Sequence, residues 1–156
     1  MPDALIDGKA IAEELRALIG AGVADLQATH TLTPGLAVVL VGEDPASQVY
    51  VRNKGVATKD AGMASFEYRF NKDVSEADLI AKVTALNKDD DVKGILVQFP
   101  VPPQISQQTI IETISPSKDV DGLNPVNAGR LASGLAALTP CTPQGSVMLA
   151  KQTLGN

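Results

Sequence analysis

The residues best suited to chemistry begin with a tyrosine and a lysine four positions apart, Tyr50 and Lys54. In a helix, this spacing places both side chains on one stripe, which continues through two small residues, Ala57 and Ala61. If the small residues face inward, Lys54 lies half-buried beside Tyr50, where an amine can transfer protons. The alternative, which the spacing alone favours, is a lysine that extends past a core tyrosine into solvent.

Four further side chains could take part in chemistry. Gln98 ends an apolar run, and a buried amide there needs hydrogen-bond partners from either a ligand or a loop. Asp119 and Asp121 form a carboxylate pair that could transfer protons or bind a cation, although loop aspartates more often cap turns. Cys141 has no histidine near it in the sequence, so we expect a structural role rather than a nucleophile pair.

The elements that must position these residues alternate between strand and helix. The apolar runs 36–41 and 94–99 are typical of strands buried on both faces of a parallel sheet. The alternating segment 63–70 is typical of a half-exposed strand near a sheet edge. The sequence therefore predicts an α/β fold: a mostly parallel sheet of three or four strands, covered by helices.

Capping residues and prolines predict where the helices begin. The first helix shows an apolar face with three-to-four-residue spacing, formed by Ile11, Leu15, Leu18, Ile19 and Leu26. Later helices are predicted over about 45–61, from 76, over about 107–114, and from 142–143 towards 154. The segment 115–143 is rich in Pro, Gly, Asn, Asp and Ser and is interpreted as mostly loop.

Ligands of open parallel sheets bind beyond the carboxyl ends of the strands. Three segments follow such ends: the helix after Val41, the residues after Val97, and the loop after Ile114. We therefore predict that four side chains from these segments converge on one cleft: Tyr50, Lys54, Gln98 and Asp121.

Composition excludes several other classes of protein. The 156 residues fit one domain, and a net charge of −5 argues against binding to nucleic acid or to an anionic membrane. The longest apolar run is too short for a membrane helix, and the N-terminus lacks the pattern of a signal peptide. A single cysteine excludes an internal disulfide and makes a structural zinc site improbable, so we expect a reducing, cytoplasmic setting. The segment from Gly20 lacks the third glycine of a dinucleotide fingerprint, and we find no nucleotide-binding motif.

Four stretches then occur in a specific order: Tyr50-Val51-x-x-Lys54, GILVQFPVP at 94–102, PSKDVDGLNP at 116–125 and PCTP at 140–143. Together they closely resemble the bifunctional methylenetetrahydrofolate dehydrogenase/methenyltetrahydrofolate cyclohydrolase family. The resemblance covers essentially the whole chain but only the N-terminal half of the family's pattern. It implies that residues 1–156 form the folate-binding catalytic domain. The family's NAD(P)-binding Rossmann domain is expected after about residue 156 and is not in this chain.

The resemblance also implies a role for each candidate residue. Lys54 is expected to mediate proton transfer in the cyclohydrolase step, with Tyr50 stacking against the aminobenzoate part of folate. Gln98 is expected to support Lys54 and the substrate, and Asp121 to hydrogen-bond the pterin ring. On this basis Lys54, Gln98 and Tyr50 are catalytic, and Tyr50, Gln98 and Asp121 bind substrate.

The parent enzyme implied by the resemblance acts in one-carbon metabolism. It oxidises 5,10-methylenetetrahydrofolate with NADP (NAD in some members) and hydrolyses the methenyl product to 10-formyltetrahydrofolate, and the parent is expected to be a homodimer. We expect this chain alone to lack dehydrogenase activity. Two alternatives stay open: a stand-alone folate-binding or interaction module without turnover, and an unrelated α/β domain in which the motifs are structural. Gly55 and Val56 depart from the polar or basic residues frequent in the family.

Overall fold

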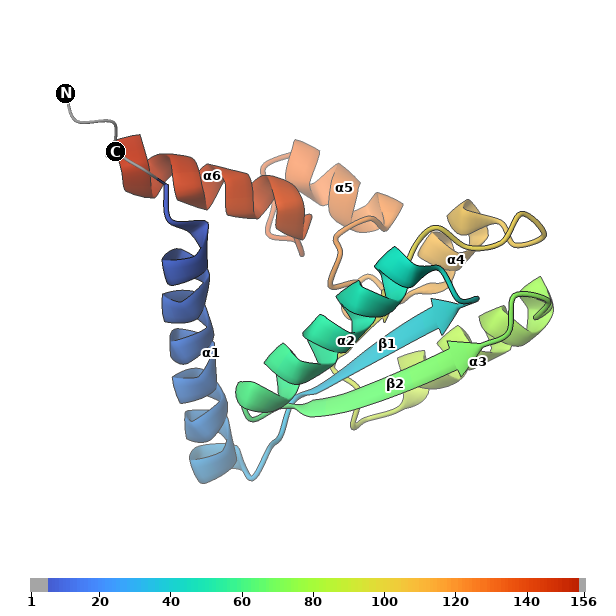
Figure 1. Cartoon of the computed structure of the whole chain (residues 1–156), viewed down its shortest axis with the longest axis horizontal. Helices are drawn as coiled ribbons and strands as arrows, with labels where there is room; N and C mark the ends of the chain where they lie inside the picture. Colours follow the sequence, from blue (N-terminus) through green and yellow to red (C-terminus); the bar gives the residue numbers. More distant parts are fainter. Residues whose placement is uncertain (1–5, 155–156) are drawn as a thin grey trace.

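The computed structural model describes residues 6–154, and this part of the chain holds three strands and six helices (Figure 1). The elements follow in the order α1 (Gly8–His30), β1 (Gly35–Val41), α2 (Pro45–Asp60), β2 (Ala64–Phe70), α3 (Glu76–Lys88), β3 (Gly94–Val97), α4 (Gln107–Thr113), α5 (Pro125–Ala132) and α6 (Cys141–Leu154).

The three strands form one parallel sheet in the order β2-β1-β3. Val39 in the central strand lies beside Tyr68 of β2 on one side and Val97 of β3 on the other. The predicted α/β class and the position of β2 at a sheet edge are confirmed. Between β3 and residue 154, the structure shows one further parallel bridge, between Ile95 and Asp119, in place of a complete fourth strand.

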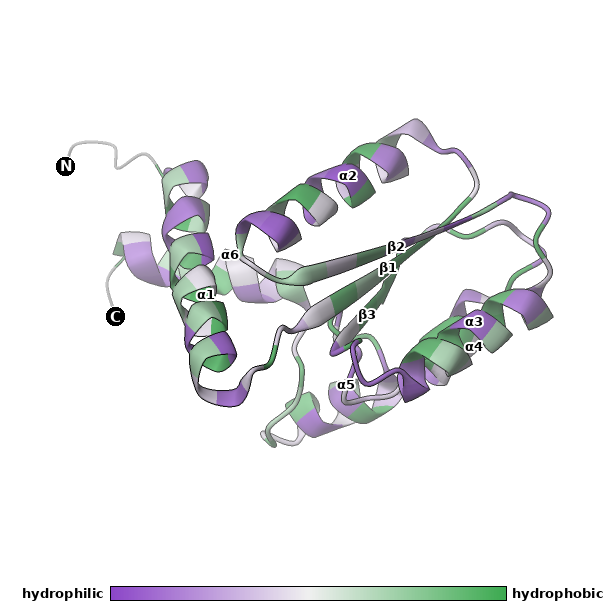
Figure 2. Cartoon of the chain, turned by 90° about the horizontal axis from the view of Figure 1, so that it is seen from below, coloured by the Kyte–Doolittle hydropathy of each residue, from purple (hydrophilic) through white to green (hydrophobic). Residues whose placement is uncertain are grey.

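Strand β1 is buried on both faces, as its unbroken apolar run predicts. Helix α2 covers one face of the sheet, and α3 and α4 cover the other (Figure 2). The core on the α2 side consists of Val38, Leu40, Val51 and Leu96. The larger core on the α3 and α4 side includes Val39, Leu79, Val83, Ile95 and Ile110.

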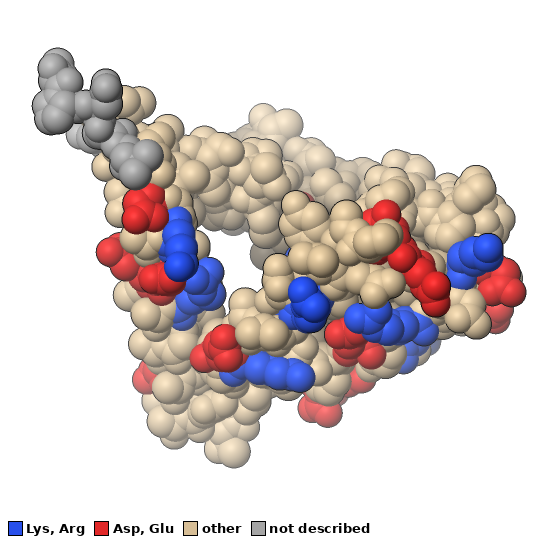
Figure 3. Space-filling view, in the orientation of Figure 1, with Lys and Arg blue, Asp and Glu red and all other residues tan. Residues whose placement is uncertain are grey.

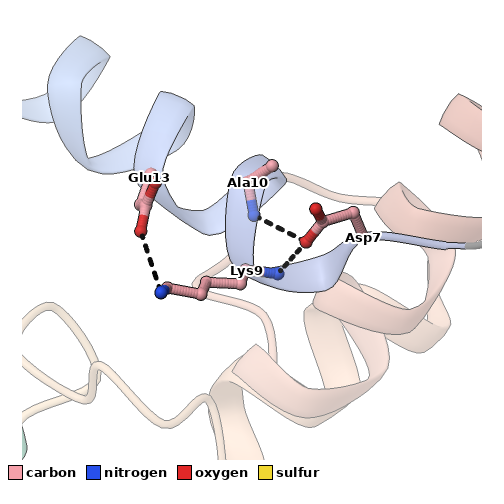
Figure 4. Close-up of polar contacts among 4 residues, drawn as sticks. All are labelled: Asp7, Lys9, Ala10 and Glu13. Carbon is pink, nitrogen blue, oxygen red and sulfur yellow. Dashed lines mark hydrogen bonds and ion pairs between the residues drawn. The ribbon is translucent and has the colours of Figure 1, made fainter.

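Side-chain caps set the beginnings of the helices. The Asp44 carboxylate accepts the Ser47 amide at 2.8 Å at the start of α2, and the Ser75 hydroxyl accepts the Asp78 amide at 3.1 Å at the start of α3. Asp7 likewise accepts the amides of Lys9 and Ala10 before α1 (Figure 4). These contacts satisfy amides that have no partner within the helix, and they confirm the predicted starts of α2 and α3.

Two predicted segments need correction. The segment interpreted as mostly loop contains α5, which starts with Asn124 as its cap and Pro125 in its first turn, the same signal that marks α2. Strand β3 ends at Val97 rather than at residue 99. The Gln98 amide still donates to Val39 O at 2.8 Å, but Pro100 then offers no amide for the ladder.

Helices α1 and α6 stand away from the sheet and leave an opening between them and α2 (Figure 3). Near its carboxyl end, α1 contacts the end of α2, where Gln27 Nε2 donates to Gly62 O at 3.1 Å. Much of the predicted apolar face of α1 is exposed: within α1 only Val23 is buried, and Leu18 is exposed. Among residues 6–154, no helix has the length and apolar character needed to cross a membrane.

Candidate active site

Lys54 lies on the side of α2 that faces the sheet. The buried residues of this helix are Ser47, Val51 and Thr58, and Lys54 falls between the last two at helical spacing. Its side chain is half-buried, and its carbonyl accepts the Thr58 hydroxyl at 2.8 Å. The chain therefore holds an amine at the rim of the core rather than on the outer surface of the helix.

Tyr50 lies one turn before Lys54, and 61% of its surface is exposed. The Lys54 Nζ lies 5.5 Å from the centre of the Tyr50 ring, within cation–π range. The alternative of a core tyrosine is therefore wrong. An exposed ring beside a half-buried amine leaves one aromatic face available to a flat ligand.

Asp121 comes to this place from the loop after α4. Burial raises the pKa of the Asp121 carboxyl, the Lys54 charge opposes that rise, and the Asp119 charge adds to it. An influence of the Lys54 charge on Asp121, 67 positions later in the sequence, is consistent with the two groups lying on the same side of the domain. The convergence of Asp121 with Lys54 and Tyr50 on one cleft stays a prediction.

Cys141, the first residue of α6, lies against the same loop. Its thiol donates to Val120 O at 3.4 Å. Burial raises the pKa of the Cys141 thiol, and the nearby Asp121 charge raises it further. A thiol that stays protonated and donates to a backbone carbonyl is a poor nucleophile, which agrees with the predicted structural role.

Gln98 lies half-buried just beyond β3, beside the central strand. Its side-chain Nε2 donates to the carbonyl of the next residue, Phe99, at 3.0 Å. This contact matches the alternative in which the amide satisfies a loop. The convergence of Gln98 with Lys54 stays a prediction.

Gly122 allows the Asp121 loop to pack against the start of α6. Its φ of +63° is a left-handed conformation, and a Cβ there would come within 2.6 Å of the Thr139 carbonyl carbon and 2.7 Å of the Pro140 nitrogen. Only glycine combines this backbone conformation with so close an approach. The glycine thus brings the PCTP stretch to the Asp121 loop.

Asp119, the other carboxylate of the pair, is buried, whereas Asp121 is half-buried. It is 2% exposed and accepts hydrogen bonds from the Asn124 backbone and the Asn127 side chain. These are structural contacts, as the alternative to a chemical role predicts, although the carboxylate bonds residues five and eight positions later and does not cap a local turn. The asparagines were missed because polar residues in an irregular segment show no periodicity; the only available signal was the Asn-Pro pair that begins α5.

The described residues offer no metal cluster, and the start of the helix after the central strand is not open to a phosphate. Within residues 6–154, no group of three or more His, Cys, Asp or Glu side chains could hold a metal. A pyrophosphate needs a helix N-terminus with free amides. At the start of α2, which follows the central strand, the Asp44 carboxylate occupies this position, and the Ser47 amide lowers the pKa of its carboxyl.

Fold and site together define a class: a parallel α/β domain that carries a lysine, a tyrosine and a carboxylate beside the sheet. The description "Tetrahydrofolate dehydrogenase/cyclohydrolase, catalytic domain" matches residues 6–121. The chain belongs to this family.

Relatives of known sequence agree with this assignment. The chain is 61% identical over 156 residues to the bifunctional protein FolD of Parvibaculum lavamentivorans, covering 100% of this chain and 52% of the relative. It is 59% identical over 152 residues to FolD of Caulobacter vibrioides, covering 97% and 51%. The chain spans about half the length of the curated relatives it matches.

Solved structures show the same fold. The bifunctional enzyme FolD from Campylobacter jejuni matches with a TM-score of 0.93 at 41% identity, covering 96% of this chain and 53% of that one. The Trypanosoma brucei methylenetetrahydrofolate dehydrogenase-cyclohydrolase, complexed with NADP cofactor and inhibitor, matches with a TM-score of 0.92 at 33% identity, covering 100% and 54%.

Proposed function

We propose that this chain is the folate-binding catalytic domain of a bifunctional enzyme of one-carbon metabolism. That enzyme oxidises 5,10-methylenetetrahydrofolate with NADP and hydrolyses 5,10-methenyltetrahydrofolate to 10-formyltetrahydrofolate. The observation that carries the proposal is the half-buried Lys54 amine, which lies beside the Tyr50 ring and is coupled to Asp121.

The hydrolytic step uses the amine. Methenyltetrahydrofolate carries a delocalised cation at the carbon that water attacks, and a cation beside Lys54 favours the neutral amine. As the new C–O bond forms, the water gives a proton to Lys54. One C–N bond at the same carbon then breaks as the adduct's hydroxyl loses its proton and becomes the formyl C=O on the other nitrogen. The freed nitrogen takes up one proton, so the net release is the single proton first given to Lys54.

The remaining residues bind and orient the substrate in this proposal. Tyr50 stacks on the aminobenzoate ring with its exposed face. Asp121 accepts hydrogen bonds from the N–H groups of the pterin, which strengthen when the carboxyl is ionised. Gln98 supports Lys54 and the substrate from the end of β3, provided that its amide turns away from Phe99 O.

The hydride-transfer step requires a second domain. The dinucleotide must hold its nicotinamide against the methylene carbon, and Asp44 already caps the start of α2, the helix that follows the central strand. We propose that an NAD(P)-binding domain supplies it in the whole enzyme. The apolar side chains that α5 and α6 leave exposed, including Leu131, Val147 and Met148, support such a contact surface.

The test is hydrolysis of methenyltetrahydrofolate by the Lys54→Met variant of the full-length enzyme and of this chain. Loss of a positioned proton-transfer group lowers the rate by roughly 10²–10⁴. The matched control is Lys59→Met, which removes an exposed lysine of the same helix and leaves the rate unchanged.

Two results would count against the proposal. Near-normal hydrolysis by Lys54→Met would remove this residue from the mechanism. Tight folate binding without any turnover by the full-length enzyme would support the alternative of a binding module. Calorimetric titration with tetrahydrofolate distinguishes an effect on catalysis from an effect on binding, because it measures binding without turnover.

A further inference from the structure

A buried polar network lies beneath the loop that carries Asp121. At its centre, Asp119 Oδ2 accepts the backbone amide of Asn124 at 2.8 Å and the side-chain Nδ2 of Asn127 at 2.9 Å. All three residues are buried, each with at most 4% of its surface exposed. Burying a carboxylate is costly unless it is hydrogen-bonded, and both of these bonds reach residues of the following helix start.

The network ties the loop to the elements around it. Asn124 Nδ2 donates to Ile114 O at 3.0 Å at the end of α4, and Asn127 Nδ2 donates to Pro116 O at 2.8 Å. On the sheet side, the Ile95 amide donates to Lys118 O at 2.7 Å. Both ends of the segment that holds Asp121 are therefore fixed to α4, α5 and β3.

Asp119 also begins the turn in which Asp121 lies. The Gly122 amide donates to Asp119 O at 3.1 Å, so residues 119 to 122 form a four-residue turn with Asp121 third. The intervening Val120 packs into the core beneath α2. Asp119 and Val120, the two residues before Asp121, are both anchored by packing or hydrogen bonds, and they set the backbone direction at Asp121.

We propose that Asp119 is a positioning residue which, through Asn124 and Asn127, holds the Asp121 carboxylate in the orientation that binds the substrate. This inference rests on the proposed function of Asp121. Asp119 touches no ligand in this scheme; it acts through the turn and through its charge. The charges that act on Asp121 are those of Lys54 from α2 and Asp119 from its own loop, and the Cys141 thiol faces the same place from α6.

A purely structural network and a positioning network predict different pH behaviour. The negative charge of Asp119 contributes to the raised pKa of Asp121. Asp119→Asn keeps an acceptor oxygen for both asparagines but removes the charge, so the Asp121 pKa falls. Tetrahydrofolate binding, which needs the ionised carboxylate, then persists to lower pH than in the wild-type chain.

The experiment measures tetrahydrofolate affinity by calorimetry across the acidic to neutral range, together with the free energy of unfolding. The variants are Asp119→Asn, Asn127→Leu and the control Gln104→Leu. The Gln104 side chain donates to Lys72 O at 2.7 Å and to Val74 O at 3.3 Å, so it ties down a different loop from the one that carries Asp121. We expect the acid limit of binding to move to lower pH in Asp119→Asn. Asn127→Leu should weaken affinity by up to about 10²-fold, whereas Gln104→Leu loses stability alone.

Unchanged affinity and pH dependence in Asp119→Asn and Asn127→Leu, with wild-type binding intact, would overturn this inference alone. A wild-type chain that binds no tetrahydrofolate would overturn the proposed function and the inference with it. If Asp119→Asn does not fold, the comparison of Asn127→Leu with Gln104→Leu still decides the question, because a positioning network predicts weaker tetrahydrofolate binding in Asn127→Leu alone.

Discussion

At the scale of single residues, the site combines groups that each carry a cost in stability. Lys54 is half-buried, and Asp121 lies where burial disfavours its charged form. A carboxyl with a raised pKa, like that of Asp121, is frequent at functional sites because ligand binding needs charges in places that folding alone would not choose. Stability and binding should therefore respond in opposite directions when Asp121 changes.

This trade-off can be measured with Asp121→Asn. The folded-state pKa of Asp121 is raised, so its contribution to stability is greatest below its unfolded-state value and is lost as the pH rises through the folded-state value. We expect Asp121→Asn to unfold at higher denaturant concentration than wild type at neutral pH, and the difference to vanish in acid. Urea titrations at both pH values measure it; equal stability at neutral pH would contradict the sign.

Asp121→Asn should also weaken tetrahydrofolate binding, because an amide accepts hydrogen bonds less strongly than a carboxylate. Loss of a charge-assisted hydrogen bond corresponds to about 1.5–3 kcal/mol. Calorimetric titration at neutral pH checks this loss. Glu112→Gln, an exposed change on α4, is the control for general charge effects.

At the scale of elements, Gly122 lets the loop after the Ile95–Asp119 bridge pack closely against the residues that precede α6. The Gly122 backbone is left-handed, and its missing Cβ makes room for residues 138–140. Gly134 has a similar φ of +70° but no neighbour within 4 Å of the position a Cβ would take. The two glycines therefore separate the effect of backbone conformation from that of close packing.

We expect Gly134→Ala to cost about 1–2 kcal/mol, the usual price of a left-handed alanine. Gly122→Ala should cost about 1–3 kcal/mol more, because its Cβ overlaps the backbone before α6. Chemical denaturation of both variants measures the difference. Equal losses would show that the approach of the two segments is not tight in solution.

At the scale of the whole molecule, two apolar clusters on either side of the sheet make a complete core. The helices outside that core, α1 and α6, remain largely exposed on their apolar residues. The core predicts independent folding, whereas the exposed helices support the proposal of a second domain. The site is then one wall of a cleft, and a ligand on an open wall stays hydrated, which weakens each polar contact.

We therefore expect the 156-residue chain to unfold in one cooperative transition, to bind tetrahydrofolate weakly, and to form no NADPH from methylenetetrahydrofolate and NADP. Without a bound nicotinamide, its effective concentration at the methylene carbon falls to the bulk value. Circular dichroism tests whether unfolding is cooperative, and NADPH absorbance tests whether hydride transfer occurs. NADPH formation, with contaminating full-length enzyme excluded, would reveal a cofactor site on this chain.

The sequence by itself determined the elements that local chemistry specifies. The run 36–41 predicts a strand buried on both faces, and Asp44-Pro45 predicts the start of α2, because apolar alternation and helix caps depend on near neighbours. The order of the four stretches that include Lys54, Gln98, Asp121 and Cys141 indicated the family. Local patterns could have located α5 as well, since Asn124-Pro125 repeats the signal of α2.

Only the tertiary structure decided which residues meet. The exposure of Tyr50, the coupling of Lys54 to Asp121, and the burial of Asp119 under Asn127 depend on packing between segments far apart in the chain. Two aspartates separated by a single valine look equivalent in sequence. The turn that Asp119 begins buries one of them and leaves the other half-buried, because side-chain direction follows backbone geometry set by long-range contacts.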